Sequence, residues 1–154
     1  MSVRVYGVEE LMARLAQGGE RAVRGVLDQM RKEGTAMAAL ASKFAPKDDG
    51  ELENAIKVRD GDGQRGADGR FQRKTVEVYV DVNMPTADGR TVGDYAYEMH
   101  EHLTPFGPLQ LGPESVSKQA SQSEMVGGKF LERAVEERAD KIMENLTTAA
   151  KKAL

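Results

Sequence analysis

Pro46 ends the longest amphipathic stretch of this chain, and this combination of helix and stop most limits how the chain can fold. Apolar side chains recur at steps of three and four between Val23 and Phe44, which is the spacing of one buried helical face. The residue before a proline avoids helical angles. The sequence therefore predicts a helix over about 20–44. Its apolar stripe is Val23, Val26, Leu27, Met30, Met37, Leu40, Ala41 and Phe44.

Small residues interrupt this helix, and they indicate close packing against another element. Gly25 and Gly34 lie inside the pattern, with Ala36, Ala38 and Ala39 nearby. A glycine in a helix costs about 1 kcal/mol relative to alanine, so tertiary packing must stabilise the helix. The absence of bulky side chains leaves room for another backbone to approach.

A second long helix is predicted from about Lys129 towards the C-terminus. Apolar residues there follow the same spacing of three and four. Charged side chains of both signs occupy the remaining positions, as on an ordinary solvated face. The predicted stripe is Phe130, Leu131, Ala134, Val135, Ala139, Ile142, Met143, Leu146, Ala149 and Ala150.

Alternating side chains predict an antiparallel pair of strands between the two helices. Valines occupy every second position from Val76 to Val82, so a strand over 75–82 turns them to one face. Its predicted partner runs over 56–59, and a third short strand contains Val3 and Val5. Short helices are expected over 9–17, 50–54 and 95–102, with Asp48 or Asp49 capping the second and Asp94 the third.

These elements predict one α+β domain over 1–154, with two principal helices packed on a small antiparallel β-sheet. A chain of 154 residues can bury a core of its own without covalent links. Two long loops, expected to be mobile, separate the elements over about 60–74 and 103–128. The second is rich in Pro, Gly, Ser and Gln, with at most one weak helix over 115–125.

Composition excludes several kinds of protein. The chain contains no cysteine, so disulfides and thiolate metal sites are ruled out. The net charge of −3 argues against a protein that coats nucleic acid, which favours a basic face. No apolar run approaches the ~18 residues that a membrane span needs, and the first residues lack a signal-peptide pattern. We therefore expect that the protein does not associate with membranes and that it is synthesised in the cytoplasm.

No stretch carries a recognisable catalytic, cofactor or metal motif. Asp60–Asp68 resembles a calcium loop, but Arg65 and Phe71 stand where that loop needs Gly and Glu. His100 and His102 could hold zinc with Glu98 only in an extended segment, and a polar helix end is the preferred interpretation. We therefore expect no catalytic residue, no cofactor, no metal and no enzymatic activity. A hydrolase with an unrecognised site is kept as an alternative.

The basic segment, defined as residues 65–74, gives a second alternative. It contains Arg65, Arg70, Arg73 and Lys74, with the aromatic Phe71 among them. Basic and aromatic side chains together can hold a nucleic-acid backbone, so an accessory nucleic-acid-binding protein is possible on sequence grounds. A solvated, charged hairpin end is the preferred interpretation.

An apolar stretch between prolines and glycines is the best candidate for contacts with other subunits. Residues 103–111 are too irregular for a core helix and too apolar for a free linker, and exposed apolar groups mark interaction surfaces. Two tyrosines just before this stretch are added to the prediction. The candidate contact residues are Leu103, Phe106, Leu109, Leu111, Tyr95 and Tyr97.

The order of three motifs resembles the head–tail joining proteins of tailed bacteriophages. The first is a Pro-x-Asp-x-Gly-x-Leu-x-x-x-Ile turn, formed here by Pro46, Asp48, Gly50, Leu52 and Ile56. A Tyr-Ala segment with a nearby Glu follows at Tyr95, Ala96 and Glu98, and a helix start at Phe130, Leu131 and Ala134. Lys129 replaces the proline usual in that family, His100 and His102 stand where a glycine is usual, and the 103–128 loop is longer.

This resemblance implies a structural virion protein. It would form a homo-oligomeric ring at the head–tail junction, with sixfold symmetry expected. The ring would join the tail tube to the head connector as a tail terminator, a neck component or a minor tail component. Its partners would be the neck, connector and tail-tube proteins. DNA would pass through without being specifically bound.

Overall fold

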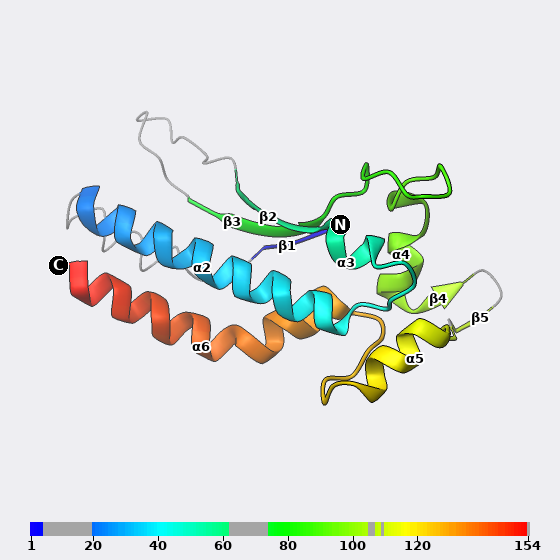
Figure 1. The fold of residues 1–154 in the computed structure, drawn as a ribbon. Helices are drawn as coiled ribbons and strands as arrows, with labels where there is room; N and C mark the ends of the chain where they lie inside the picture. Colours follow the sequence, from blue (N-terminus) through cyan, green and yellow to red (C-terminus); the bar gives the residue numbers. More distant parts are fainter. Residues whose placement is uncertain (5–19, 62–73, 105–106, 109, 154) are drawn as a thin grey trace.

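Two long helices and a small antiparallel sheet form the body of the protein, as the sequence predicts. A computed structural model describes residues 1–4, 20–61, 74–104, 107–108 and 110–153. Helices α2 (Glu20–Phe44) and α6 (Phe130–Ala153) lie side by side. Strands β1 (Ser2–Arg4), β2 (Ile56–Asp60) and β3 (Val76–Val80) lie against them (Figure 1). The predicted α+β class is therefore confirmed, while the helix predicted over 9–17 lies outside the described residues.

The sheet has the order β1-β3-β2, and both pairs of neighbours are antiparallel. Val78 in the central strand lies opposite Val3 on one side and opposite Val58 on the other. The predicted pairing of β2 with β3 is confirmed, but β3 ends at Val80 rather than Val82. The chain turns after this point, and Val82 is 39% exposed. The alternating valine pattern of the sequence therefore extends two residues beyond the end of β3.

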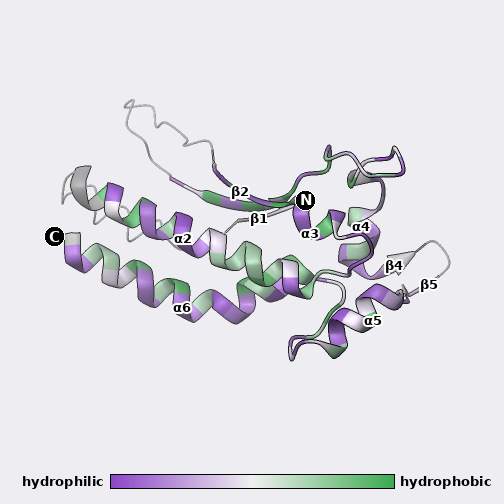
Figure 2. Cartoon of the chain, viewed as in Figure 1, coloured by the Kyte–Doolittle hydropathy of each residue, from purple (hydrophilic) through white to green (hydrophobic). Residues whose placement is uncertain are grey.

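The core lies between the two helices and the valine face of β3. Val76, Val78 and Val80 are buried, together with most of the predicted stripe of α2. A Cβ atom added to Gly34 would lie 2.8 Å from Val76 Cγ1 and 3.1 Å from Val58 Cγ1. The small residue therefore allows α2 to lie directly on the sheet. Figure 2 shows hydrophobic residues concentrated in the second half of this helix.

The stripe predicted for α6 is correct at most positions but wrong at two. Phe130, Leu131, Ala134, Ile142, Leu146 and Ala150 are buried. Ala139 is exposed, and the Met143 side chain is 43% exposed. Ile142, adjacent to Met143, is only 3% exposed. The structure therefore decides which member of the adjacent apolar pair faces the core.

A buried carboxylate joins α2 to α6. Glu33 is only 5% exposed, although the sequence pattern did not place it in the core. Its carboxylate accepts hydrogen bonds from Arg138 Nη2 and Asn145 Nδ2, both at 2.7 Å, and from Gln29 Nε2 at 2.8 Å. These partners make burial tolerable, because an unpaired buried charge is strongly unfavourable.

Five short elements gather at the end of the helix pair where α2 finishes (Figure 1). They are α3 (Glu51–Ala55), α4 (Gly93–Glu101), β4 (Leu103–Thr104), β5 (Gly107–Pro108) and α5 (Pro113–Ala120). Neither Asp48 nor Asp49 caps α3: Gly50 precedes it in the left-handed conformation, with φ 83°. Asp94 lies within α4 and accepts hydrogen bonds from the Thr91 amide and hydroxyl. Both capping predictions are therefore wrong.

Residues 103–128 contain more regular structure than the one weak helix predicted over 115–125. The segment contains the β4–β5 pair and α5, and two of its residues are part of the interior. Ser115 is 2% exposed and exchanges hydrogen bonds with the Lys47 backbone, while Val126 is 4% exposed. The Gly127 amide donates to the Phe44 carbonyl oxygen at 2.8 Å. Polar groups attach the segment to the end of α2, which apolar periodicity cannot reveal.

Candidate functional site

A groove of about 560 Å³ opens at the end of the molecule where the short elements gather. We call it the acidic groove. One wall is the turn from α2 into α3, a second is α4, and a third is the connection from β5 to α5. The lining residues that matter for binding are Asp48, Asp49, Glu51, Tyr95, Glu98 and Leu111.

Hydrogen bonds between distant parts of the chain hold these walls in place. Glu51 accepts a hydrogen bond from the Ala87 amide at 2.6 Å, which ties α3 to the loop before α4. Lys118 of α5 donates to the carbonyl oxygens of Ser42 and Ala45 at 2.6 and 2.7 Å and pairs with Glu53. A cation suits this position, because the C-terminal carbonyls of a helix lack internal partners. The groove is therefore a fixed feature of the fold.

The residues that line the groove carry more negative than positive charge. Asp88 is satisfied: the Thr86 hydroxyl and the Arg90 guanidinium hold the pKa of its carboxyl at about 2. The side chains of Asp48, Asp49 and Glu98 have no hydrogen-bond or ion-pair partner among the described residues. Burial raises the pKa of the Tyr95 hydroxyl, and the negative charges of Glu51 and Asp48 raise it further. Both the carboxylates and the tyrosine ring favour binding of a positively charged group.

The structure brings together only some of the predicted contact residues. Tyr95 and Leu111 both line the acidic groove. Tyr97 is 69% exposed and lies on α4 outside the groove lining. Leu103 belongs to β4, while Phe106 and Leu109 lie outside the described residues. The sequence indicated the acidic turn and the tyrosines separately, but it contained no signal that they share one groove.

The histidine pair lies at the end of α4, as the preferred interpretation has it, with His100 in the last turn and His102 as the C-cap, but His100 is buried. His100 is 3% exposed, and its ring packs edge-on against Phe130 with centroids 4.9 Å apart. Its Nδ1 lies 3.0 Å from Glu101 Oε1, and the Lys129 amide donates to its carbonyl oxygen. The end of α4 is thereby joined to the start of α6. No three His, Asp or Glu side chains in the described part of the chain are placed to hold a metal ion.

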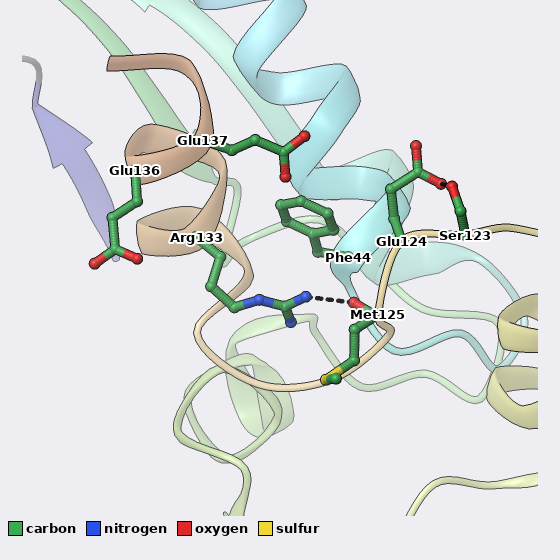
Figure 3. A pocket seen from close by; sticks show the side chains of 7 residues that line it. All are labelled: Phe44, Ser123, Glu124, Met125, Arg133, Glu136 and Glu137. Atoms are coloured by element: carbon green, nitrogen blue, oxygen red, sulfur yellow. Dashed lines mark hydrogen bonds between the residues drawn. The ribbon is translucent and has the colours of Figure 1, made fainter. Parts of the chain in front are cut away.

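A second, more open cavity of about 480 Å³ lies where α6 begins (Figure 3). Arg133 crosses it, with its guanidinium carbon 4.5 Å from the centre of the Phe44 ring. The same guanidinium donates hydrogen bonds to the carbonyl oxygens of Met125 and Gly128. Arg133 is therefore satisfied within the fold, and its contacts fix the segment before α6 rather than present a cation to a ligand.

Strand β2 carries two cations, and one of them already has an acidic partner. Lys57 and Arg59 project from β2, but Arg59 pairs with Glu77 at 2.9 Å and lies over the Tyr79 ring. The arginines of the basic segment lie outside the described residues.

We therefore expect negligible binding of duplex DNA near physiological salt. A gel-shift titration of the full chain and of a variant lacking residues 61–70 checks this. A salt-sensitive shift at micromolar protein that disappears in the deletion variant would favour the nucleic-acid alternative, because phosphate contacts weaken steeply with salt.

Comparisons of the chain with protein-family models, with curated proteins and with solved structures find no match. Among the described helices, none has the length and apolar character needed to cross a membrane. The groove, which residues of two of the three motifs line, is thus the observation from which a function can be argued.

Proposed function

We propose that this protein is a structural subunit of a tailed phage that joins the tail tube to the head connector by self-association. One observation carries the proposal: motifs separated along the sequence come together at one end of the fold. Pro46, Asp48, Gly50 and Leu52 of the turn line the same groove as Tyr95 and Glu98 of the Tyr-Ala segment. The third motif starts α6 and is attached to His100 through Lys129.

The order of elements also supports the proposal. The resemblance implies an N-terminal helical region, a turn, a β-hairpin, a Tyr-Ala segment, a variable region and a C-terminal helix. The described chain contains α2, α3, β2 with β3, α4, α5 and α6 in that order. The proposed mechanism involves no catalysis: copies of the protein bind one another and their neighbours through complementary surfaces.

Exposed apolar side chains near this end suit such contacts. Tyr97 and Met125 are each 69% exposed, and Val116 is 55% exposed. They lie on α4, in the segment before α6, and on α5 respectively. Large exposed apolar groups commonly mark surfaces that other proteins cover. We propose that they contact neighbouring copies or the neck, connector and tail-tube proteins, while DNA passes without specific binding.

The test is to locate the protein in phage particles. We expect deletion of its gene to leave filled heads and complete tails unjoined. Cryo-electron microscopy of wild-type particles should show a ring of copies, sixfold by expectation, at the head–tail junction. Its level relative to the tail tube distinguishes a tail terminator from a neck or minor tail component. A single copy there, or none, contradicts the proposal. The free protein belongs to the host cytoplasm during assembly.

A further inference from the structure

We propose that the acidic groove of one copy receives the basic segment of a second copy. This inference rests on the proposed self-association and adds to it the two surfaces that meet. It concerns the arginines Arg65, Arg70 and Arg73 as occupants and the carboxylates Asp48, Asp49 and Glu98 as their partners.

The groove has the chemistry to hold a guanidinium group. Five carboxylates and two cations line it, and one of those cations, Arg90, is already paired with Asp88 at 2.7 Å. Carboxylates bind arginine through paired, charge-assisted hydrogen bonds. Tyr95 offers a ring face for the same cation. Met99 and Leu111 add apolar lining beside these polar groups.

The basic segment has the complementary composition. Between Gly61 and Thr75 the chain carries three arginines and one lysine against two aspartates, and Phe71 stands between two of the arginines in sequence. Arginine and aromatic residues are enriched where proteins contact one another. Phe71 suits the apolar lining, and the flanking arginines suit the carboxylates at the rim.

The acidic groove lies next to the start of β2, and the chain continues towards the basic segment from the end of that strand. Strand β2 begins at Ile56, directly after the α3 wall of the groove, and ends at Asp60. Arg31 of α2 holds Asp60 there with hydrogen bonds of 3.0 and 2.6 Å. The end of β2 therefore lies one strand length from the groove wall, roughly 16 Å at the usual rise per residue, and the basic segment follows it in sequence. A neighbouring copy placed head to tail brings its segment to the groove, and such contacts form a ring when the rotation between neighbouring copies closes.

A peptide titration tests the contact directly. The probe is a synthetic peptide of residues 61–75, added to the full chain in which Arg65, Arg70 and Arg73 are replaced by serine. Nuclear magnetic resonance should show amide shifts at Asp48, Asp49, Tyr95 and Glu98. The double variant Asp48→Lys/Asp49→Lys should bind about tenfold more weakly, since two attractions become repulsions.

Matched charge changes elsewhere provide the control. Glu136→Lys/Asp140→Lys alters two exposed carboxylates on α6 and should change the affinity by less than about twofold. The inference is overturned if no groove amide shifts at about 1 mM peptide. It is also overturned if the control weakens binding as much as the groove variant does.

Mixing variants shows which copy supplies the segment. We expect Asp48→Lys/Asp49→Lys chains and Arg70→Ser/Arg73→Ser chains to form pairs when mixed, because each pair retains one intact contact, but no larger ring. Oligomers that survive both changes overturn the inference and leave the proposed function standing. If instead the peptide binds in the groove but the protein is missing from the head–tail junction, the proposed function is overturned and the contact between groove and segment stands.

Discussion

Replacing Ile142 with alanine is expected to lower the free energy of unfolding by about 2–5 kcal/mol, as for other buried aliphatic truncations. Replacing the adjacent Met143 with alanine should cost under about 0.5 kcal/mol, as for most surface changes. Ile142 is 3% exposed and Met143 is 43% exposed. The two variants therefore compare truncation of a buried and of a partly exposed large apolar residue, about 100° apart around the axis of α6.

The surroundings of Ile142 favour a large loss. A small gap of about 20 Å³ already lies beside it, bordered by Met37 of α2, Val76 of β3 and Leu146 of α6. Removing methyl groups enlarges this gap, and the cost of a truncation rises with the volume of the cavity left behind. The close approach of α2 to the sheet at Gly34 limits collapse around it.

Urea unfolding monitored by circular dichroism measures both changes. Glu137→Ala, on the exposed face of the same helix, is a polar control that should also cost under about 0.5 kcal/mol. Equal losses for Ile142→Ala and Met143→Ala would mean that α6 is rotated relative to the core. The comparison requires that the unfolding free energy of every variant fall with urea concentration at the same slope. This slope reports the surface exposed on unfolding.

The sequence predicted the elements whose burial follows a regular period. Helices α2 and α6 each bury one stripe, and strand β3 buries its valine face, so their apolar residues repeat with the period of the backbone. Glu77 on the other face of β3 is also buried, which the alternation did not predict. The period left ambiguous which of two adjacent apolar residues points inward, as at Ile142 and Met143. It also placed exposed Ala139 in the stripe, because alanine is tolerated on either face.

Elements held by polar contacts were not predictable in the same way. Ser115 and Lys118 attach α5 to the backbone near the end of α2, and no periodic pattern signals such bonds. The acidic groove illustrates the same limit. Its walls come from 46–52, 95–99 and 110–115, and each wall was visible as a local motif. Their meeting depends on tertiary hydrogen bonds such as that from the Ala87 amide to Glu51.

Removing the Glu33 carboxylate should also destabilise the protein strongly. Loss of one partner of a buried ion pair typically costs about 3–5 kcal/mol, because the other charge is left uncompensated. We expect Glu33→Ala to fall near the lower end of that range, about 3 kcal/mol. Arg138 can turn towards water, since its side chain is 26% exposed. Asn145 and Gln29 lose the same acceptor.

A second substitution separates the loss of the pair from the loss of packing. In Glu33→Leu/Arg138→Leu both charges are replaced by apolar groups, and such replacements are often neutral or stabilising. The double variant should therefore recover at least half of the loss seen in Glu33→Ala. If the double variant is as unstable as Glu33→Ala, the cost comes from the altered packing of α2 against α6 rather than from the unpaired charge.

The dependence on pH gives an independent measurement of the same pair. Burial alone would raise the pKa of Glu33, but hydrogen bonds from Arg138, Asn145 and Gln29 outweigh it and hold the pKa below its ordinary value of 4.5. A carboxyl with a lowered folded pKa stabilises the protein above its unfolded pKa. This contribution is lost as the pH falls through the folded value. The difference in unfolding free energy between wild type and Glu33→Ala should therefore be constant above about pH 5.5 and shrink below pH 4.5. A difference that stays unchanged down to pH 3 would show that the carboxylate charge does not stabilise the contact between α2 and α6.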